Sequence, residues 1–339
     1  MKRILNNRET DMSFNLKEVD WSEFKSPPKY ARPLVRWWWT GLDVEKEELI
    51  KEVKELDEAG FFGAEIQVFM IGSPMDLEKK DKERAARSHR FMQPYYYKMV
   101  KAVLDEASKR GMIMDLTIGS AWPAGGTHIS NEDSMKVLMV GEQTIEGPLE
   151  YSDKIPEYIR PRKIGLGIIE DIDEGIKLEA VVAFKPLSGQ EPGKIAYRKF
   201  KTTYIDRDSI IDLTDKVDDD LYLNWNIPEG IWQILSFYSG PSGIHPLADS
   251  RSEPGKGSLV LDHLSSKSIK KHMDLHLGEG KKYFENHFGT TLRAIFTDSL
   301  ELASSWLWTE DLLNQFEKRR GYNLRRFLPI CFAPYRDNK

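Results

Sequence analysis

Apolar and polar positions along the chain follow two different periods, and the change between them divides the sequence. Between residues 33 and 134, short apolar segments alternate with stretches in which apolar residues recur every three or four positions. The short segments predict β-strands at 33–39, 63–69 and 112–119, and the longer stretches predict amphipathic helices at 43–60 and 93–111. Strands that alternate with helices form a parallel sheet through right-handed crossovers.

The first predicted helix shows the pattern most clearly. Leu49, Val53 and Leu56 fall on one face, Asp43 is the expected N-cap and Gly60 the expected stop. The polar stretch 76–90, between the second strand and the second helix, is expected to be a loop.

From about residue 135 to 250 the helical period disappears. Short runs that alternate apolar and polar residues take its place, and they lie at 136–147, 177–187, 209–217 and 230–240. This period of two predicts an inserted, antiparallel, β-rich domain.

The α/β alternation then resumes. Strands are predicted at 257–265 and 292–302, and helices at 267–289 and 309–321. This makes five β/α units, whereas a closed (β/α)8 barrel has eight. We therefore expect an α/β fold with the first five units of a TIM-type barrel, and a chain that is part of a longer product. The expected divisions are an N-terminal extension (1–30), the first part of the barrel (31–134), the inserted β-rich domain (135–250) and the continuation of the barrel (251–339).

Composition narrows the class of function. The 339 residues carry a net charge of −5, which argues against a nucleic-acid partner, and the single cysteine, Cys331, excludes an internal disulfide. The first residues lack the apolar core of a signal peptide, and no apolar run is long enough to span a membrane. We therefore expect a cytoplasmic protein with no membrane partner, and no motif predicts a nucleotide or organic cofactor.

Several candidate functional residues follow predicted strands. Trp39 ends the first strand, and it fits either core packing or stacking on a sugar. Trp122 lies in the glycine-rich loop after the third strand. Asp262 and His263 follow the fourth, where binding a substrate and capping the next helix are equally plausible.

Two acids, Asp298 and Glu301, lie where the last predicted strand ends. Two carboxylates in separate environments suit general acid/base chemistry such as glycoside hydrolysis. Strand ends in β/α units meet at one edge of the sheet, so we expect Trp122, Asp262, His263, Asp298 and Glu301 to converge around a pocket of sugar size. Glu301 would need partial burial, for example by Trp122 or Trp306, to act as an acid.

These motifs together resemble a known family. "RWWWTG", "AGFFGAEIQVF", "DLTIGSAWPAGG", "GSLVLDHLS" and "FTDSLELASSWLWTEDLLNQFEKRRGYNLRRFLP" are similar, in order and spacing, to the N-terminal catalytic region of glycoside hydrolase family 106, the α-L-rhamnosidases. The resemblance covers roughly residues 30 to 330 and includes the β-rich insertion.

The resemblance implies a (β/α)8 barrel, hydrolysis of terminal α-L-rhamnosyl linkages with inversion by two glutamates, and a calcium ion near the sugar. It matches Glu301 to a catalytic or substrate-contacting acid, Asp298 to an acid beside it, and Trp122 and His263 to pocket positions; the second glutamate has no counterpart here. We therefore expect Glu301 to be catalytic and the substrate to be bound by Trp39, Trp122, Asp262, His263 and Asp298. The alternative is a non-catalytic carbohydrate-binding or truncated pseudoenzyme fragment. A metal-dependent barrel hydrolase is disfavoured because the first strand lacks a His-x-His pair.

Overall fold

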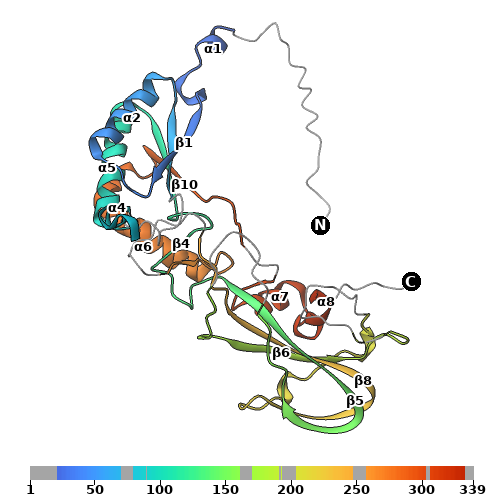
Figure 1. The fold of residues 1–339 in the computed structure, drawn as a ribbon. Coiled ribbons are helices and arrows are strands. Elements are labelled where there is room, and N and C mark those ends of the chain that lie inside the picture. Colours follow the sequence, from blue (N-terminus) through green and yellow to red (C-terminus); the bar gives the residue numbers. More distant parts are fainter. Residues whose placement is uncertain are drawn as a thin grey trace.

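The structure is a computed structural model with two parts arranged end to end (Figure 1). It describes residues 21–69, 79–88, 90–160, 170–190, 192, 204–246, 257–302 and 306–332. One part is built on a parallel sheet and the other on a long, curled antiparallel sheet. No helix within the described residues is both long and apolar enough to cross a membrane.

The parallel sheet has four strands in the order β1-β2-β3-β10. These are β1 (Leu34–Thr40), β2 (Gly63–Phe69), β3 (Ile113–Thr117) and β10 (Leu292–Phe296). Four helices lie along one side of this sheet in Figure 1: α2 (Lys46–Glu58), α4 (Lys82–Ser88), α5 (Pro94–Lys109) and α6 (Ser266–Phe284). The first three strands and the helices α2 and α5 agree with the sequence pattern.

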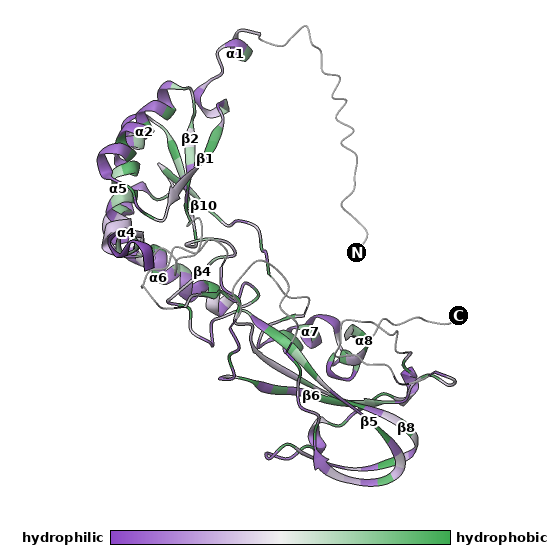
Figure 2. Cartoon of the chain, in the orientation of Figure 1, coloured by the Kyte–Doolittle hydropathy of each residue, from purple (hydrophilic) through white to green (hydrophobic). Residues whose placement is uncertain are grey.

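Alternation within each strand explains why one face of the sheet is covered. Ala64, Ile66 and Val68 of β2 are fully buried in a core with Val53 of α2 and Val100 of α5. Successive side chains of a strand point to opposite faces, so the residues between them lie on the face without helices. Figure 2 shows the apolar strands inside the hydrophilic outer surfaces of the helices.

The predicted fourth parallel strand is wrong. Residues 257–265 contain only the short strand β9 (Leu259–Val260), which pairs antiparallel with β4 (Gly125–Gly126) in the glycine-rich loop. A Cβ at Gly125 would lie 2.3 Å from the carbonyl oxygen of Leu259, so glycine permits this close pairing. The parallel sheet therefore passes from β3 directly to β10, and a partial barrel remains a prediction.

The antiparallel sheet has the strand order β11-β5-β8-β6-β7. Its members are β5 (Lys136–Lys154), β6 (Lys177–Phe184), β7 (Ile211–Asp212), β8 (Tyr222–Pro241) and β11 (Leu307–Trp308). Alternate residues of β5 enter two separate cores: Leu138 and Val140 enter one, and Val137 and Met139 enter the other. Both faces of this sheet are therefore packed, whereas a period of two predicts one apolar and one polar face; the antiparallel pairing of β5 with β8 agrees with the predicted β-rich insertion.

The C-terminal segment also packs on the antiparallel sheet. β11 pairs with β5. Leu312 of α7 (Leu312–Arg320) and Leu328 of α8 (Leu328–Phe332) pack in the same core as Leu138 and Val140 of β5. The sequence pattern placed α7 on the parallel sheet as part of a fifth β/α unit. Trp308, only 4% exposed, explains the difference because it buries its indole against this sheet.

Two local predictions also differ from the structure. Glu45, not Asp43, is the N-cap of α2, and the expected loop 76–90 contains the helix α4. The remaining elements are α1 (Trp21–Lys25) and the 3-10 turns η2 (Lys29–Ala31), η3 (Arg207–Ser209), η4 (Thr214–Lys216), η5 (Glu285–His287) and η6 (Arg325–Phe327).

Candidate functional site

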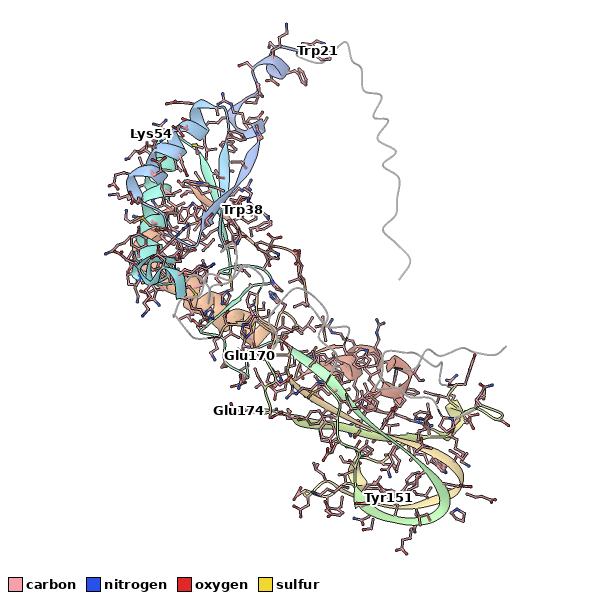
Figure 3. All side chains as sticks on the ribbon, viewed as in Figure 1. Trp21, Trp38, Lys54, Tyr151, Glu170 and Glu174 are labelled. Atoms are coloured by element: carbon pink, nitrogen blue, oxygen red, sulfur yellow. The ribbon has the colours of Figure 1, made fainter. Side chains whose placement is uncertain are left out.

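The face of the parallel sheet that no described helix covers carries charged and aromatic side chains; we call it the open face. Val35, Trp37 and Trp39 of β1 pack toward the helices, so Arg36 and Trp38 lie on the open face. Figure 3 shows Trp38 on the side away from α2, whose outer surface carries Lys54. By the same alternation β2 contributes Glu65.

Arg36 is the centre of an ion-pair network on the open face. Its Nε lies 2.8 Å from Oε1 of Glu65, and its Nη1 donates to Oδ2 of Asp298 at 2.6 Å. The guanidinium also lies 5.2 Å from the ring centre of Trp38 and 4.8 Å from that of Phe296. These contacts connect β1, β2 and the end of β10.

The Glu65 carboxyl differs from an ordinary surface acid. Its side chain is 16% exposed. Burial raises its pKa, the positive charge of Arg36 opposes that shift, and the negative charges of Asp298 and Asp115 add to it. Glu65 therefore holds a proton more readily than an exposed glutamate, even though it has a cationic neighbour.

A second ion pair lies beside this network. Arg293 of β10 donates to Asp115 of β3 through Nε at 3.1 Å and through Nη2. The β10–β3 register shifts between Leu292 and Ala294, so this irregularity coincides with the position of Arg293.

The predicted acid pair lies just beyond β10. The backbone N–H of Ser299 donates to Oδ1 of Asp298 at 2.7 Å, and the Ser299 hydroxyl donates to Oε1 of Glu301 at 3.0 Å. Asp298 is largely buried, but Glu301 is exposed. The burial of Glu301 by tryptophans that an acid role would require is therefore absent from this arrangement of the described residues.

The tryptophans separate into two groups. Trp38 is 43% exposed and lies 4.6 Å from Phe69 and 6.0 Å from the half-buried Trp122, measured between ring centres. Trp39 is 1% exposed and packs against Trp37 in the helix-side core. The stacking role expected for Trp39 does not fit its position because no sugar can reach its ring; Trp38 is the accessible indole of β1.

Asp262 has the position of a structural residue. It is 1% exposed, its Oδ2 accepts from the Thr309 hydroxyl at 2.8 Å and its Oδ1 accepts from the backbone of Leu264 at 2.9 Å. Thr309 follows β11, so this carboxylate ties the start of α6 to the antiparallel part. Of the two readings left open by the sequence, these contacts favour the structural one. Ser265 is the N-cap of α6.

His263 lies against the glycine-rich loop that carries Trp122. Burial lowers its pKa, while a hydrogen bond with the backbone of Ala124 and the charge of Asp262 oppose the shift. Its Nε2 is buried without a hydrogen-bond partner among the described residues. A neutral imidazole with one uncommitted nitrogen suits a polar contact to a ligand.

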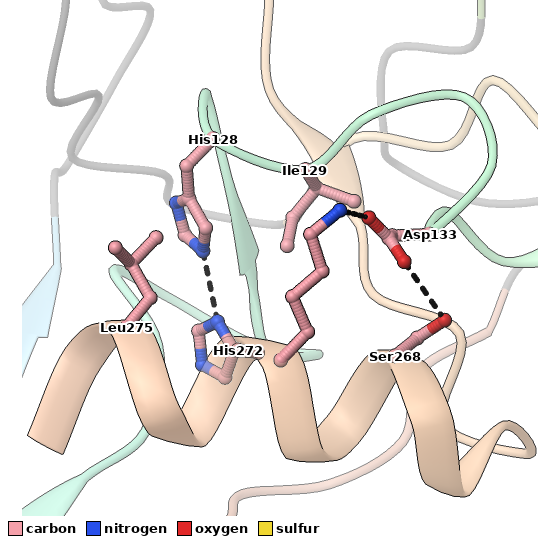
Figure 4. A pocket seen from close by; sticks show the side chains of 7 residues that line it. His128, Ile129, Asp133, Ser268, His272 and Leu275 are labelled. Atoms are coloured by element: carbon pink, nitrogen blue, oxygen red, sulfur yellow. Dashed lines mark hydrogen bonds and ion pairs between the residues drawn. The ribbon is translucent and has the colours of Figure 1, made fainter. Parts of the chain in front are cut away.

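Three histidines connect the same loop to α6. Figure 4 shows His128 beside His272, with Nε2 and Nδ1 2.8 Å apart, next to a cavity of about 20 Å³. The other nitrogen of His272 lies 2.5 Å from the carbonyl oxygen of Ile118. In the same view Asp133 accepts hydrogen bonds from Ser268 and Lys271. Burial opposes the charge of Asp133, but those bonds and one from Ser130 lower its pKa overall.

His276 lies one turn beyond His272. It is fully buried, stacked 6.1 Å from His272 and 5.8 Å from Tyr96. Burial, with the charges that His272 and His128 can carry, lowers its pKa to about 3. Both histidines of α6 therefore favour the neutral form and act as packing side chains.

A groove of about 750 Å³ lies beside the start of α2, along β1. Its size suits a small ligand. Its wall combines tryptophans and carboxylates, namely Trp37, Trp38, Trp39, Asp43, Glu45, Glu48 and Glu52. The residues expected to surround a sugar-sized pocket, Trp122, Asp262, His263, Asp298 and Glu301, do not line this groove.

The described residues do not fit the calcium ion that the resemblance implies. Calcium binds six to eight oxygen ligands. Here the carboxylates of Glu65, Asp298 and Asp115 are each paired with a guanidinium, and no group of three or more acidic, histidine or cysteine side chains within the described part of the chain could hold a metal ion. A calcium site therefore stays a prediction.

Sequence reasoning missed Arg36, Trp38 and Glu65. The signal was present because each of β1 and β2 carries one charged residue, Arg36 or Glu65, between apolar ones. A charged residue in the middle of a strand of a parallel sheet is unusual, since both faces of such sheets are generally covered. That pattern could have marked the open face.

Comparisons with known proteins agree on a family. Residues 25–199 and 176–333 match the model of the Glyco_hydro_106 family, described as alpha-L-rhamnosidase. A Formosa agariphila protein named as a candidate beta-glucuronidase is 24% identical over 331 residues, which are 93% of this chain and 26% of that protein.

A solved structure has a similar fold. The structure of a rhamnosidase from Novosphingobium sp. PP1Y aligns with a TM-score of 0.61 and 17% identity, over 91% of this chain and 42% of the rhamnosidase chain. The chain thus spans less than half the length of each of these two proteins.

Proposed function

The chain belongs to the Glyco_hydro_106 family, and from this premise we propose that it contributes to a glycosidase that hydrolyses terminal α-L-rhamnosyl linkages. The observation that supports the proposal is the open face, where Trp38 and Trp122 lie beside the linked side chains of Arg36, Asp298, Ser299 and Glu301. Aromatic rings offer a surface for the apolar side of a sugar, and carboxylates accept from its hydroxyls.

The charges of the open face favour a neutral sugar over a uronic acid. The Formosa protein's name refers to a glucuronidase, and a sugar carboxylate needs an available cation. Arg36 and Arg293 are each paired with a carboxylate of the same face. A uronate would have to displace one of these partners, whereas the hydroxyls and methyl group of a rhamnoside fit the carboxylates and indoles.

In the proposed reaction Glu301 is the general acid. It donates its proton to the glycosidic oxygen as the bond to the anomeric carbon breaks. Water attacks from the opposite side with inversion and gives its proton to the second carboxylate that the resemblance implies, for which no residue of this chain is nominated. Trp38, Trp122 and His263 bind the sugar. Glu301 is exposed in this arrangement, so closure around the substrate would have to bury it for this role.

The test is Glu301→Gln in the longer product of which this chain is expected to be a part, with aryl α-L-rhamnosides as substrates. Glutamine keeps the size of the side chain but delivers no proton, so we expect turnover to fall by about 10² to 10⁴-fold for a poor leaving group and by much less for dinitrophenol. Glu58→Gln, at an exposed position at the end of α2, is the matched control and should keep wild-type rates.

The second candidate is a carbohydrate-binding fragment without catalysis, which the exposure of Glu301 favours. Calorimetry with phenyl α-L-rhamnoside separates the two. Binding without turnover in the wild-type chain supports this second candidate. If the chain neither binds nor hydrolyses the rhamnoside, both candidate functions are contradicted.

A further inference from the structure

We infer that Arg36 is the positioning residue of the acidic segment 298–301: it anchors Asp298 on the open face and, through Ser299, sets the place of Glu301. The catalytic consequence of this role rests on the proposed function, but the anchoring itself does not.

The sheet order makes the Arg36–Asp298 contact unusual. β1 and β10 are the two outer strands, separated by β2 and β3. In a flat sheet, three spacings of about 4.8 Å would put them about 14 Å apart. Arg36 nevertheless donates to Asp298 at 2.6 Å and lies 4.8 Å from the Phe296 ring. Phe296 belongs to β10, so side chains from both outer strands meet across the open face at this end of the sheet.

A continuous series of contacts then leads to Glu301. Asp298 Oδ2 accepts from Arg36, while its Oδ1 accepts from the Ser299 backbone. The Ser299 hydroxyl in turn donates to Glu301 at 3.0 Å. Segment 297–302 forms no helix or strand, so these side-chain bonds fix its path. The guanidinium is itself held by Glu65 and by the rings of Trp38 and Phe296.

Arginine is the residue type that can make these contacts together. Its planar guanidinium presents donors in a fixed fork and stacks on aromatic rings, whereas a lysine ammonium is a compact, strongly hydrated point charge. Arg36 uses Nε toward Glu65 and Nη1 toward Asp298. Lysine at this position keeps the positive charge but cannot present two donors in a fixed geometry to Glu65 and Asp298 at once.

The test measures hydrogen exchange of the segment 297–302 in Arg36→Lys, with Arg293→Lys as the matched control. Arg293 also lies next to the open face and pairs with a carboxylate, but its bonds within the described residues go to Asp115 and not to the segment. Loss of a charge-assisted hydrogen bond should speed exchange of the Ser299 amide by about fivefold or more in Arg36→Lys. Equal exchange in the two variants overturns the inference.

A double-mutant cycle separates anchoring from general destabilisation. Asp298→Asn should reproduce the faster exchange, and combining it with Arg36→Lys should add little, because both changes remove one interaction. Glu65→Gln should change the Ser299 exchange by less than about twofold, since Arg36 keeps Asp298. Fully additive effects of Arg36→Lys and Asp298→Asn contradict the inference.

Enzyme kinetics test the catalytic consequence of the anchoring by Arg36, separately from the hydrogen-exchange experiment. If the rhamnoside is turned over, Arg36→Lys should lower kcat by at least tenfold with KM within about threefold of wild type, because Trp38 and Trp122 still bind the sugar. A loss confined to KM would contradict positioning. If wild type shows no turnover, the proposed function fails, and the exchange cycle still decides whether Arg36 anchors the segment.

Discussion

The two sheets of this protein use polar residues in opposite ways. Both faces of the antiparallel sheet carry apolar cores, and its ion pairs, such as Lys177–Glu310, lie at the exposed surface. The parallel sheet has an apolar core on one face and the network of Arg36, Glu65 and Asp298 on the other. Polar residues on the open face meet no packing need, so that face is the place to look for chemistry.

The largest expected effect comes from the antiparallel core. Phe237→Ala removes a fully buried ring and should lower the free energy of unfolding by about 3 to 5 kcal/mol. Trp38→Ala on the open face should cost no more than about 1.5 kcal/mol, the size of an aromatic pair, while weakening sugar binding. Chemical denaturation measures both. If both variants lose the same free energy of unfolding, the proposed difference between the two sheets is wrong.

A smaller effect concerns the pH dependence of stability, which tests the buried His276 of α6. The pKa of His276 in the folded state is about 3, below its ordinary value near 6.5, so the unfolded chain binds the proton first. The stabilisation of the folded state that comes from a neutral, buried His276 is fully present above pH 6.5 and is lost as the pH falls toward 3. At pH 5 the loss is about 2 kcal/mol.

His276→Leu removes this titration and should reduce the fall in stability between pH 7 and pH 5 by about that amount. His287→Gln is the control, because His287 lies 2.9 Å from Asp105 in a partly exposed pair and lacks such burial. Parallel pH curves for wild type and His276→Leu would show that His276 is not neutral in the folded protein.

The smallest effect concerns the link between the two parts. Asp262→Asn weakens the hydrogen bonds from Thr309 and Leu264 and should cost about 1 kcal/mol. Asp274→Asn, in an exposed pair with Lys270 on the same helix, should change stability by less than about 0.5 kcal/mol. If the two variants are indistinguishable by thermal unfolding, Asp262 does not join the parts.

The candidate site was only partly predictable. Trp122 is connected to Asp298 through Trp38 and Arg36, and His263 contacts Ala124, two residues after Trp122. The strand-end argument named none of these three connecting residues. For Trp39 the sequence left core packing and sugar stacking open, because a position at a strand end says where along the strand it lies, not whether its ring faces helices or the open side; its burial favours core packing. Calcium and the inverting mechanism remain predictions.

The sequence by itself determined the two periods, and with them the parallel strands β1 to β3, the helices α2 and α5, and the antiparallel sheet. Those features depend on which side chains are apolar and how far apart they stand, and both are local properties. Only the tertiary structure decided that residues 259–260 pair with a glycine loop, that α7 packs on the antiparallel sheet and that Arg36 reaches Asp298. Each of these joins segments that are distant in the sequence, and a contact between distant segments depends on how the intervening chain folds rather than on any local pattern.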